Sequence, residues 1–214
     1  MEVQSHGVLF EDDVIYKITG KRKSEYQNLL EGAYTSSLDI YKGLHSDANY
    51  SIKVSKGGKG IGCGDILRFM RHCRDTEFTM VVGCWTQVNP TTKRYSDIYE
   101  FYMSPQHYTT LWGGLTLENV EPFVSYVKSI PEGKPAQLAN RKLWKERRQE
   151  LYDQHSKGLA TIDAKIDSKN QRRVQCSIKL DEMVTAGIPF HKYTFDYKGI
   201  ALPYEQESKP RSFS

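Results

Sequence analysis

The sequence predicts an α/β fold in which a mixed central β-sheet is flanked by helices, with a helical insert and a C-terminal β-ribbon. Segments whose apolar residues repeat with helical spacing alternate along the chain with short apolar segments typical of strands. The run FTMVVGCWTQV at 78–88 is almost continuously apolar, as in a strand buried on both faces. Beyond residue 105 the pattern becomes mainly helical, and from residue 159 apolar and polar residues alternate again.

The first thirty residues predict two elements. Residues 1–20 have no strong period and predict a short strand or hairpin that ends at Gly20, with its turn at Asp12 and Asp13. From Ser24 to Ala33 the apolar residues follow at i, i+3, i+4 and i+7, which predicts an amphipathic helix.

The middle of the chain predicts the core of the sheet. Two short strand-like runs, at 38–41 and 50–54, are separated by turn-forming residues and predict a hairpin. The glycines at 57–64 predict a mobile loop, and their order does not match a phosphate-binding Walker loop. Asp65 then begins a helix whose buried face is expected to carry Ile66, Phe69, Met70 and Cys73. Two further strands are predicted at 78–88 and 95–103.

The second half of the chain predicts the insert and the ribbon. Residues 105–158 have helical patterns, and the last helix is expected to bury a stripe of Leu143, Trp144, Leu151 and Tyr152. Residues 159–183 alternate around a polar turn and predict a two-stranded ribbon with one apolar face, whereas the polar residues 203–214 predict a loose tail. We therefore expect a single domain at 1–202 with its core at about 21–103.

Composition is ordinary for a soluble protein, because 38% of the 214 residues are hydrophobic and 26% are charged. No apolar run approaches the ~18–20 residues of a membrane-spanning helix, and the N-terminus lacks a basic-then-apolar secretory pattern. We therefore expect a cytoplasmic protein with no membrane partner. The four cysteines form no CxxC pair, which favours reduced, buried thiols over a zinc site.

Asp39 and Lys53 are the candidate functional residues of the predicted sheet. Each is a charged residue within a short apolar run, and burying an unpaired charge is costly. Mg²⁺ prefers carboxylate oxygens and usually takes one or two carboxylates together with substrate phosphate. A cation and a phosphate between Asp39 and Lys53 would make a phosphodiester-cleaving site. The alternative is a plain salt bridge between the two side chains.

The order of these elements resembles the core of the PD-(D/E)xK nuclease superfamily. The shared order is a helix, a strand with Asp39, a strand with Lys53, a helix from Asp65 and a buried strand from Phe78. With its helical insert and basic ribbon, the chain looks most like a type II restriction endonuclease. The resemblance covers roughly residues 21–88 and is a match of element order rather than of close sequence. It implies a restriction-endonuclease-like core, Mg²⁺ as the cofactor and double-stranded DNA as the substrate.

The chain departs from the family motif at one position. The acid expected two residues before the lysine is Ser51 here. In some restriction endonucleases a serine takes that place and the acid has moved to the following helix, where Asp65 is the matching residue, twelve positions after Lys53. Helix capping is the alternative role of Asp65. Glu31 corresponds to an accessory acid on the first helix, although an ordinary surface acid is the alternative.

The resemblance implies a role for each of these residues. Asp39 and Asp65 would ligate Mg²⁺, and Lys53 would orient the attacking water and stabilise charge on the phosphate, next to Ser51. Glu31 would act indirectly, by supporting the residues that ligate Mg²⁺. A rival D-x-K motif exists at Asp163-Ala164-Lys165, with Asp153 as its upstream acid. That acid lies on a predicted helix, and no helix followed by a buried strand comes after the motif.

Net charge is only +4, but basic residues gather locally, which is the pattern of phosphate binding. The helix around 141–148 would contact phosphates, and a two-stranded ribbon fits the major groove, where arginine and glutamine read bases. The candidate DNA-binding residues are Lys142, Lys145 and Arg148 on the helix and Lys169, Gln171, Arg172, Arg173 and Gln175 on the ribbon. A solvated helix face and a solvated hairpin tip are the alternatives.

These features predict a Mg²⁺-dependent, sequence-specific double-stranded DNA endonuclease. Restriction enzymes commonly act as dimers because palindromic sites mirror two-fold symmetry, so a homodimer is expected. Two alternatives remain open: a structure-specific or repair nuclease with the same core, and a non-catalytic DNA-binding module, for which Ser51 is an argument.

Overall fold

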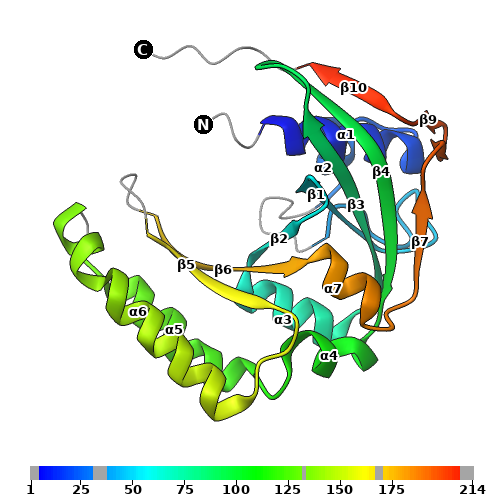
Figure 1. The fold of residues 1–214 in the computed structure, drawn as a ribbon. Helices are drawn as coiled ribbons and strands as arrows, with labels where there is room; N and C mark the ends of the chain where they lie inside the picture. Colours follow the sequence, from blue (N-terminus) through cyan, green and yellow to red (C-terminus); the bar gives the residue numbers. More distant parts are fainter. Residues whose placement is uncertain (1–4, 31–37, 132–133, 167–170, 208–214) are drawn as a thin grey trace. The chain divides into compact units, whose positions relative to one another are not determined.

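The structure is a computed structural model that describes residues 5–30, 38–131, 134–166 and 171–207 (Figure 1). The chain divides into two compact units, each built from segments that are distant in the sequence. Unit 1 comprises Met1–Ile61, Glu77–Met103 and Gly187–Ser214, and unit 2 comprises Gly62–Thr76 and Ser104–Ala186. The predicted α/β class with mixed strand pairing and flanking helices is confirmed. Among the helices of the described residues, none has the length and apolarity needed to span a bilayer.

Unit 1 is built on a mixed sheet with the strand order β10-β4-β3-β1. Strands β1 and β3 are parallel and the other pairs are antiparallel, and β7 pairs with the part of β4 that β10 leaves open. The strands are β1 (Tyr50–Lys56), β3 (Phe78–Gln87), β4 (Thr92–Met103), β7 (Phe190–Tyr193) and β10 (Tyr204–Glu207), and β8 (Asp196–Tyr197) and β9 (Ile200–Ala201) form a separate small pair. The helices are α1 (Ser5–Thr19) and α2 (Lys23–Gln27).

Helix α1 packs against one face of this sheet, where the sequence predicted a hairpin (Figure 1). That prediction was wrong because Phe10, Val14, Ile15 and Ile18 are spaced at i, i+4, i+5 and i+8, which is one helical face. The first three are buried completely or almost so, together with Ile52 of β1. A Cβ at Gly83 of β3 would come within 2.5 Å of the Phe10 ring. Glycine at this point therefore lets the helix lie close to the sheet.

Four other predicted elements differ in the structure. The glycine-rich segment 57–64 is not simply a loop, because after a tight turn β2 (Gly60–Asp65) pairs with β1 at Ser55 and Ile61. The run 38–41 is not a full strand and forms a single antiparallel bridge between Ile40 and Tyr50. Residues 204–207 of the predicted loose tail form β10, because β4 offers them an open edge. The helix predicted from Ser24 is the short α2, and residues 31–33 lie outside the described part of the chain.

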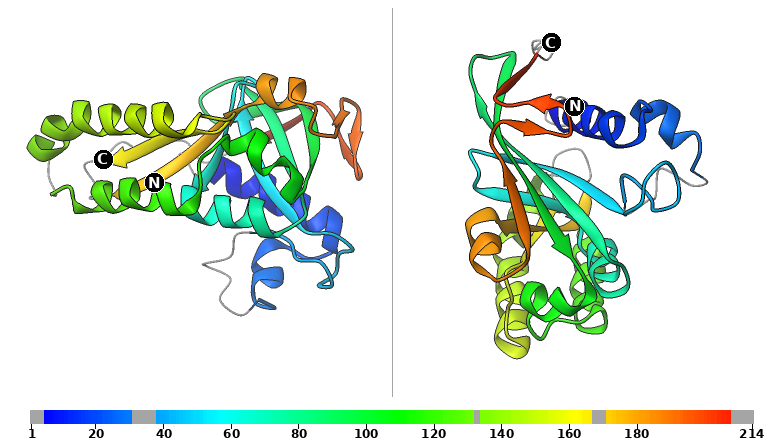
Figure 2. Two further views of the ribbon diagram at one scale, coloured as in Figure 1. Left: turned by 90° about the horizontal axis from the view of Figure 1, so that it is seen from below. Right: turned by 90° about the vertical axis from the view of Figure 1, so that its right-hand side faces the viewer.

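Unit 2 holds the predicted insert and ribbon, and both are confirmed (Figure 2). Strands β5 and β6 pair antiparallel, β2 continues beside β6, and helices α3 and α5 contact β6. The buried faces predicted for α3 and for β6 are confirmed, whereas Leu143 of α6 is 41% exposed and does not belong to a buried stripe. The elements are α3 (Ile66–Asp75), a 3₁₀ turn (Pro105–His107), α4 (Tyr108–Trp112), α5 (Leu117–Ser129), α6 (Lys134–His155), β5 (Thr161–Ile166), β6 (Arg172–Lys179) and α7 (Leu180–Thr185).

A buried carboxylate joins the C-terminal strands of unit 1 to β4. Glu100 is only 4% exposed and accepts hydrogen bonds from the hydroxyls of Tyr197 at 2.8 Å and Tyr193 at 2.9 Å. The ammonium of Lys198 lies 3.5 Å from the same carboxylate. Burial and the negative charge of Glu100 raise the pKa of the Tyr197 hydroxyl well above its usual value, so Tyr197 stays a donor.

We predict that Tyr197→Phe lowers the free energy of unfolding by about 1.5–3 kcal/mol, because a buried carboxylate loses a donor. Tyr102→Phe is the matched control, since the Tyr102 hydroxyl lies 3.4 Å from Glu100 and its side chain is 46% exposed. Its loss should stay below about 0.5 kcal/mol. Urea denaturation measures both, and equal losses would show that the Glu100 hydrogen bonds do not hold the C-terminal strands.

Candidate metal-binding site

Asp39 lies at the edge of the unit 1 sheet, next to the beginning of β1. Its own N–H donates to the Tyr50 carbonyl at 2.9 Å, which brings its side chain alongside the strand. Its carboxylate Oδ2 accepts the Ile52 N–H at 2.5 Å and lies 3.6 Å from the Lys53 ammonium. Lys53 Nζ also donates to the Ile52 carbonyl at 3.1 Å. The structure therefore brings together the two residues that the sequence singled out.

The local pairing of β1 explains this arrangement. Strand β1 pairs with β3 along all seven residues, but with β2 only where Ser55 faces Ile61. The N–H and the carbonyl of Ile52 are instead used by Asp39 and Lys53. Unpaired strand edges need partners for their backbone groups. An acid and a lysine therefore complete the hydrogen bonding of β1 while they pair with each other.

The sequence reasoning missed a second acid–lysine pair beside the first. Glu11 of α1 and Lys23 of α2 form an ion pair of 2.6 Å, and the Asp39 carboxylate lies near enough to Glu11 to raise the pKa of its carboxyl. The four side chains are between 18 and 22% exposed. We call Glu11, Lys23, Asp39 and Lys53 the charge cluster. The sequence signal that could have identified Glu11 is its position directly after Phe10, which lies on the buried face of α1. This signal can be used only if residues 5–19 are recognised as a helix.

The electrostatics of the charge cluster suit a cation. Burial and the neighbouring Asp39 carboxylate raise the pKa of Glu11 to about 7, while Lys23 acts in the opposite direction. A divalent cation bound by two neighbouring carboxylates would relieve the repulsion between their negative charges. Two carboxylates with phosphate and water are an ordinary ligand set for Mg²⁺. Glu11 and Asp39 are therefore the candidate ligands for a magnesium ion.

The other predicted site residues have separate positions. Ser51 is buried in β1, two residues before Lys53. Asp65 belongs to unit 2, where it caps α3 by accepting the Arg68 N–H at 3.0 Å. Glu31 lies outside the described residues. Within the described ranges, no three or more Asp, Glu, His or Cys side chains are grouped so that they could hold a metal ion. The role of Asp65 as a metal ligand stays a prediction.

The rival D-x-K motif is engaged in other contacts. Asp163 on β5 forms a 2.7 Å ion pair with Arg148 of α6, whose guanidinium also donates to the Ile162 carbonyl at 2.7 Å. Asp153 accepts a hydrogen bond from Gln149 on the same helix. The contacts of Asp163 thus join the ribbon to α6.

The candidate DNA-binding residues of unit 2 differ in exposure. Lys142 is 89% exposed, and Lys145 is also exposed, next to the Trp144 ring. Arg148 is held by Asp163, and Arg172 donates to the Ile130 carbonyl at 3.1 Å. Half-buried positions on the ribbon are occupied by Gln171, Arg173 and Gln175, whereas Lys169 lies outside the described residues.

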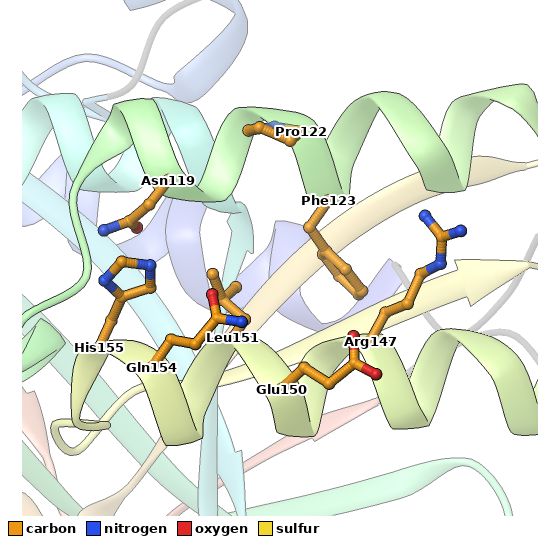
Figure 3. A pocket seen from close by; sticks show the side chains of 8 residues that line it. All are labelled: Asn119, Pro122, Phe123, Arg147, Glu150, Leu151, Gln154 and His155. Carbon is orange, nitrogen blue, oxygen red and sulfur yellow. The ribbon is translucent and has the colours of Figure 1, made fainter.

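Unit 2 also contains a shallow groove of about 370 Å³ between α5 and α6 (Figure 3). Polar side chains line it, including Arg147, Glu150 and His155, around the apolar Phe123 and Leu151. None of the residues predicted for catalysis or DNA binding is among them. The groove therefore does not belong to the candidate site.

Comparisons of the chain with protein-family models, with curated proteins and with solved structures give no match. The function of the protein therefore has to be argued from the residues of the site.

We predict that Glu11→Gln flattens the dependence of stability on pH. A folded-state pKa of about 7, above the unfolded value of about 4.5, means that the stability contributed by protonated Glu11 is complete below pH 4.5 and is lost as the pH rises through 7. Between pH 4.5 and 8 the wild type should lose at most about 3 kcal/mol through this group. Chemical denaturation at several pH values measures the slope.

Glu77→Gln, which removes an exposed acid of the same unit, serves as the control and should keep the wild-type slope. If Glu11→Gln has the same slope as the wild type, the pKa of Glu11 is not raised by its surroundings.

Proposed function

We propose that the protein is a Mg²⁺-dependent endonuclease that hydrolyses phosphodiester bonds of double-stranded DNA at a defined sequence, like a type II restriction enzyme. The observation that supports this most is the position of Lys53 against Asp39, at a sheet edge where Glu11 supplies a second carboxyl. These residue types are the ones that metal-assisted phosphodiester hydrolysis needs. The second carboxyl, from Glu11, is the supporting feature that a plain salt bridge between Asp39 and Lys53 does not require.

In this proposal Glu11 and Asp39 would hold the magnesium ion. When bound, Mg²⁺ supplies a water of lowered pKa and polarises the phosphate. Lys53 stabilises the charge that develops on the phosphate, and its ammonium is already positioned by the Ile52 carbonyl. Ser51, which is buried in β1, stands where the usual motif has an acid, and Asp65 is the residue that the family resemblance names for that role.

DNA is proposed to contact the basic residues of unit 2. Lys142 and Lys145 are exposed on α6 and would neutralise phosphates. The ribbon would read bases through Gln171, Arg172, Arg173 and Gln175, since arginine pairs with guanine and glutamine with adenine. Two copies of the chain acting on a palindromic site would make a homodimer.

A non-catalytic DNA-binding module is the second candidate. It is favoured by Ser51 and by the neutral balance of the charge cluster, in which each carboxyl already has a lysine. Incubating plasmid DNA with the protein and Mg²⁺ separates the functions. Discrete fragments support the proposed endonuclease, nicks or a smear indicate a structure-specific nuclease, and unchanged plasmid with retained DNA binding indicates the binding module.

We predict that Asp39→Ala and Lys53→Ala each reduce plasmid cleavage by about 10²–10³-fold or more, because each removes a charge that acts on the phosphate or its metal. Binding of DNA in Ca²⁺, measured by gel shift, should persist. Lys42→Ala removes an exposed lysine close to Asp39 in the sequence and should leave the cleavage rate unchanged. Normal cleavage by either site variant would reject the proposed centre.

We predict that Asp65→Asn abolishes cleavage without unfolding the protein. Asparagine caps helices about as well as aspartate, so the variant keeps α3 while it removes the negative charge. Plasmid cleavage together with thermal unfolding separates the two roles of Asp65. Normal cleavage at an unchanged melting temperature would leave Asp65 as a cap alone.

A further inference from the structure

Lys23 is the member of the charge cluster that neither the sequence nor the proposed function uses. Its ammonium lies 2.6 Å from Glu11 Oε2, and its side chain is 20% exposed. Lys53, by contrast, is 3.6 Å from Asp39 and has a second acceptor in the Ile52 carbonyl. The tighter of the two lysine–carboxylate contacts is therefore the one on Glu11.

The position of α2 does not depend on the Lys23 ammonium. The backbone N–H of Lys23 donates to Asp12 Oδ1 at 2.6 Å. The guanidinium of the neighbouring Arg22 pairs with Asp12 at 3.0 Å and with Asp13 at 3.2 Å. Tyr26 is fully buried, and its hydroxyl accepts the Tyr41 N–H at 2.9 Å. The contacts with Asp12 and Asp13 hold the start of α2 against α1, and Tyr26 joins α2 to the segment at Tyr41. Among the described residues, the Lys23 ammonium makes its ion pair with Glu11.

The effect of Lys23 on a cation bound at Glu11 follows from the charges of the charge cluster. The charge cluster balances two acids with two lysines, so a divalent cation would enter a site that is already neutral. A positive charge on the carboxylate that must ligate the cation repels it, and partial burial weakens the screening by solvent. The cation must therefore displace Lys23 from Glu11 before Glu11 can act as a full ligand.

We propose that Lys23 is a positioning residue that competes with the divalent cation for Glu11 and sets the affinity of the site. In the metal-free protein Lys23 holds Glu11 at the charge cluster, and it leaves Glu11 when the cation binds. This inference rests on the proposed function, because it takes Glu11 and Asp39 as the cation's ligands.

The test is a Ca²⁺ titration by isothermal calorimetry at low salt and pH 8.5, where the carboxyls are ionised. Lys23→Met should bind Ca²⁺ about tenfold more tightly than the wild type, since one unit charge is removed next to the site. Lys23→Arg keeps the charge and should restore wild-type affinity to within about a factor of three. Lys17→Met removes an exposed lysine from α1, the helix that carries Glu11, and should not change the affinity.

The outcomes separate this inference from the proposed function. If the wild type binds no Ca²⁺, or if Asp39→Asn binds it as well as the wild type does, the metal site of the proposed function fails. A second outcome rejects only the role of Lys23. In it, Asp39→Asn loses Ca²⁺ binding, whereas Lys23→Met keeps the wild-type circular dichroism spectrum and binds Ca²⁺ no more tightly than the wild type. The metal site then stands. If Lys17→Met gains as much Ca²⁺ affinity as Lys23→Met, the effect comes from the net charge of the protein and the role of Lys23 is rejected.

Discussion

The contact of Asp39 and Lys53 with the backbone of Ile52 is the interaction on which the candidate site depends. In the described part of the chain, the N–H and the carbonyl of Ile52 are satisfied by one carboxylate and one ammonium. A buried polar group without a partner is costly, so the same contacts that complete the sheet also hold the two charges in place. Structure and candidate chemistry thus share the same atoms.

The second acid–lysine pair follows from the same constraint. Glu11 enters this region because Phe10 and Val14 pack α1 onto the sheet, and its carboxyl meets that of Asp39. Two like charges in a partly buried place are unfavourable without a counter-charge, which Lys23 provides. A structural ion-pair network and a metal site can use this set of residues equally well. Divalent cation binding is the property that tells them apart.

Sequence reasoning succeeded where one local pattern decided the structure. The alternation around Lys53, the apolar run of β3 and the capped start of α3 at Asp65 each depend on neighbours within a few residues. It failed where a distant partner decided. Residues 204–207 became β10 only because β4 had an open edge. The helix at 5–19 is a different case, because the helical spacing of its apolar residues is a local signal that was not recognised. Leu143 lies on an apolar pattern but stays 41% exposed.

The sequence by itself determined the α/β class, the insert, the ribbon and the choice of Asp39 and Lys53 as residues that belong together, because periodicity and isolated charges in apolar runs are local properties. Only the tertiary structure decided that Glu11 and Lys23 join them. These two residues are brought to Asp39 by the packing of α1 and α2 on the sheet, and such packing depends on shape and burial between segments that are far apart in the chain.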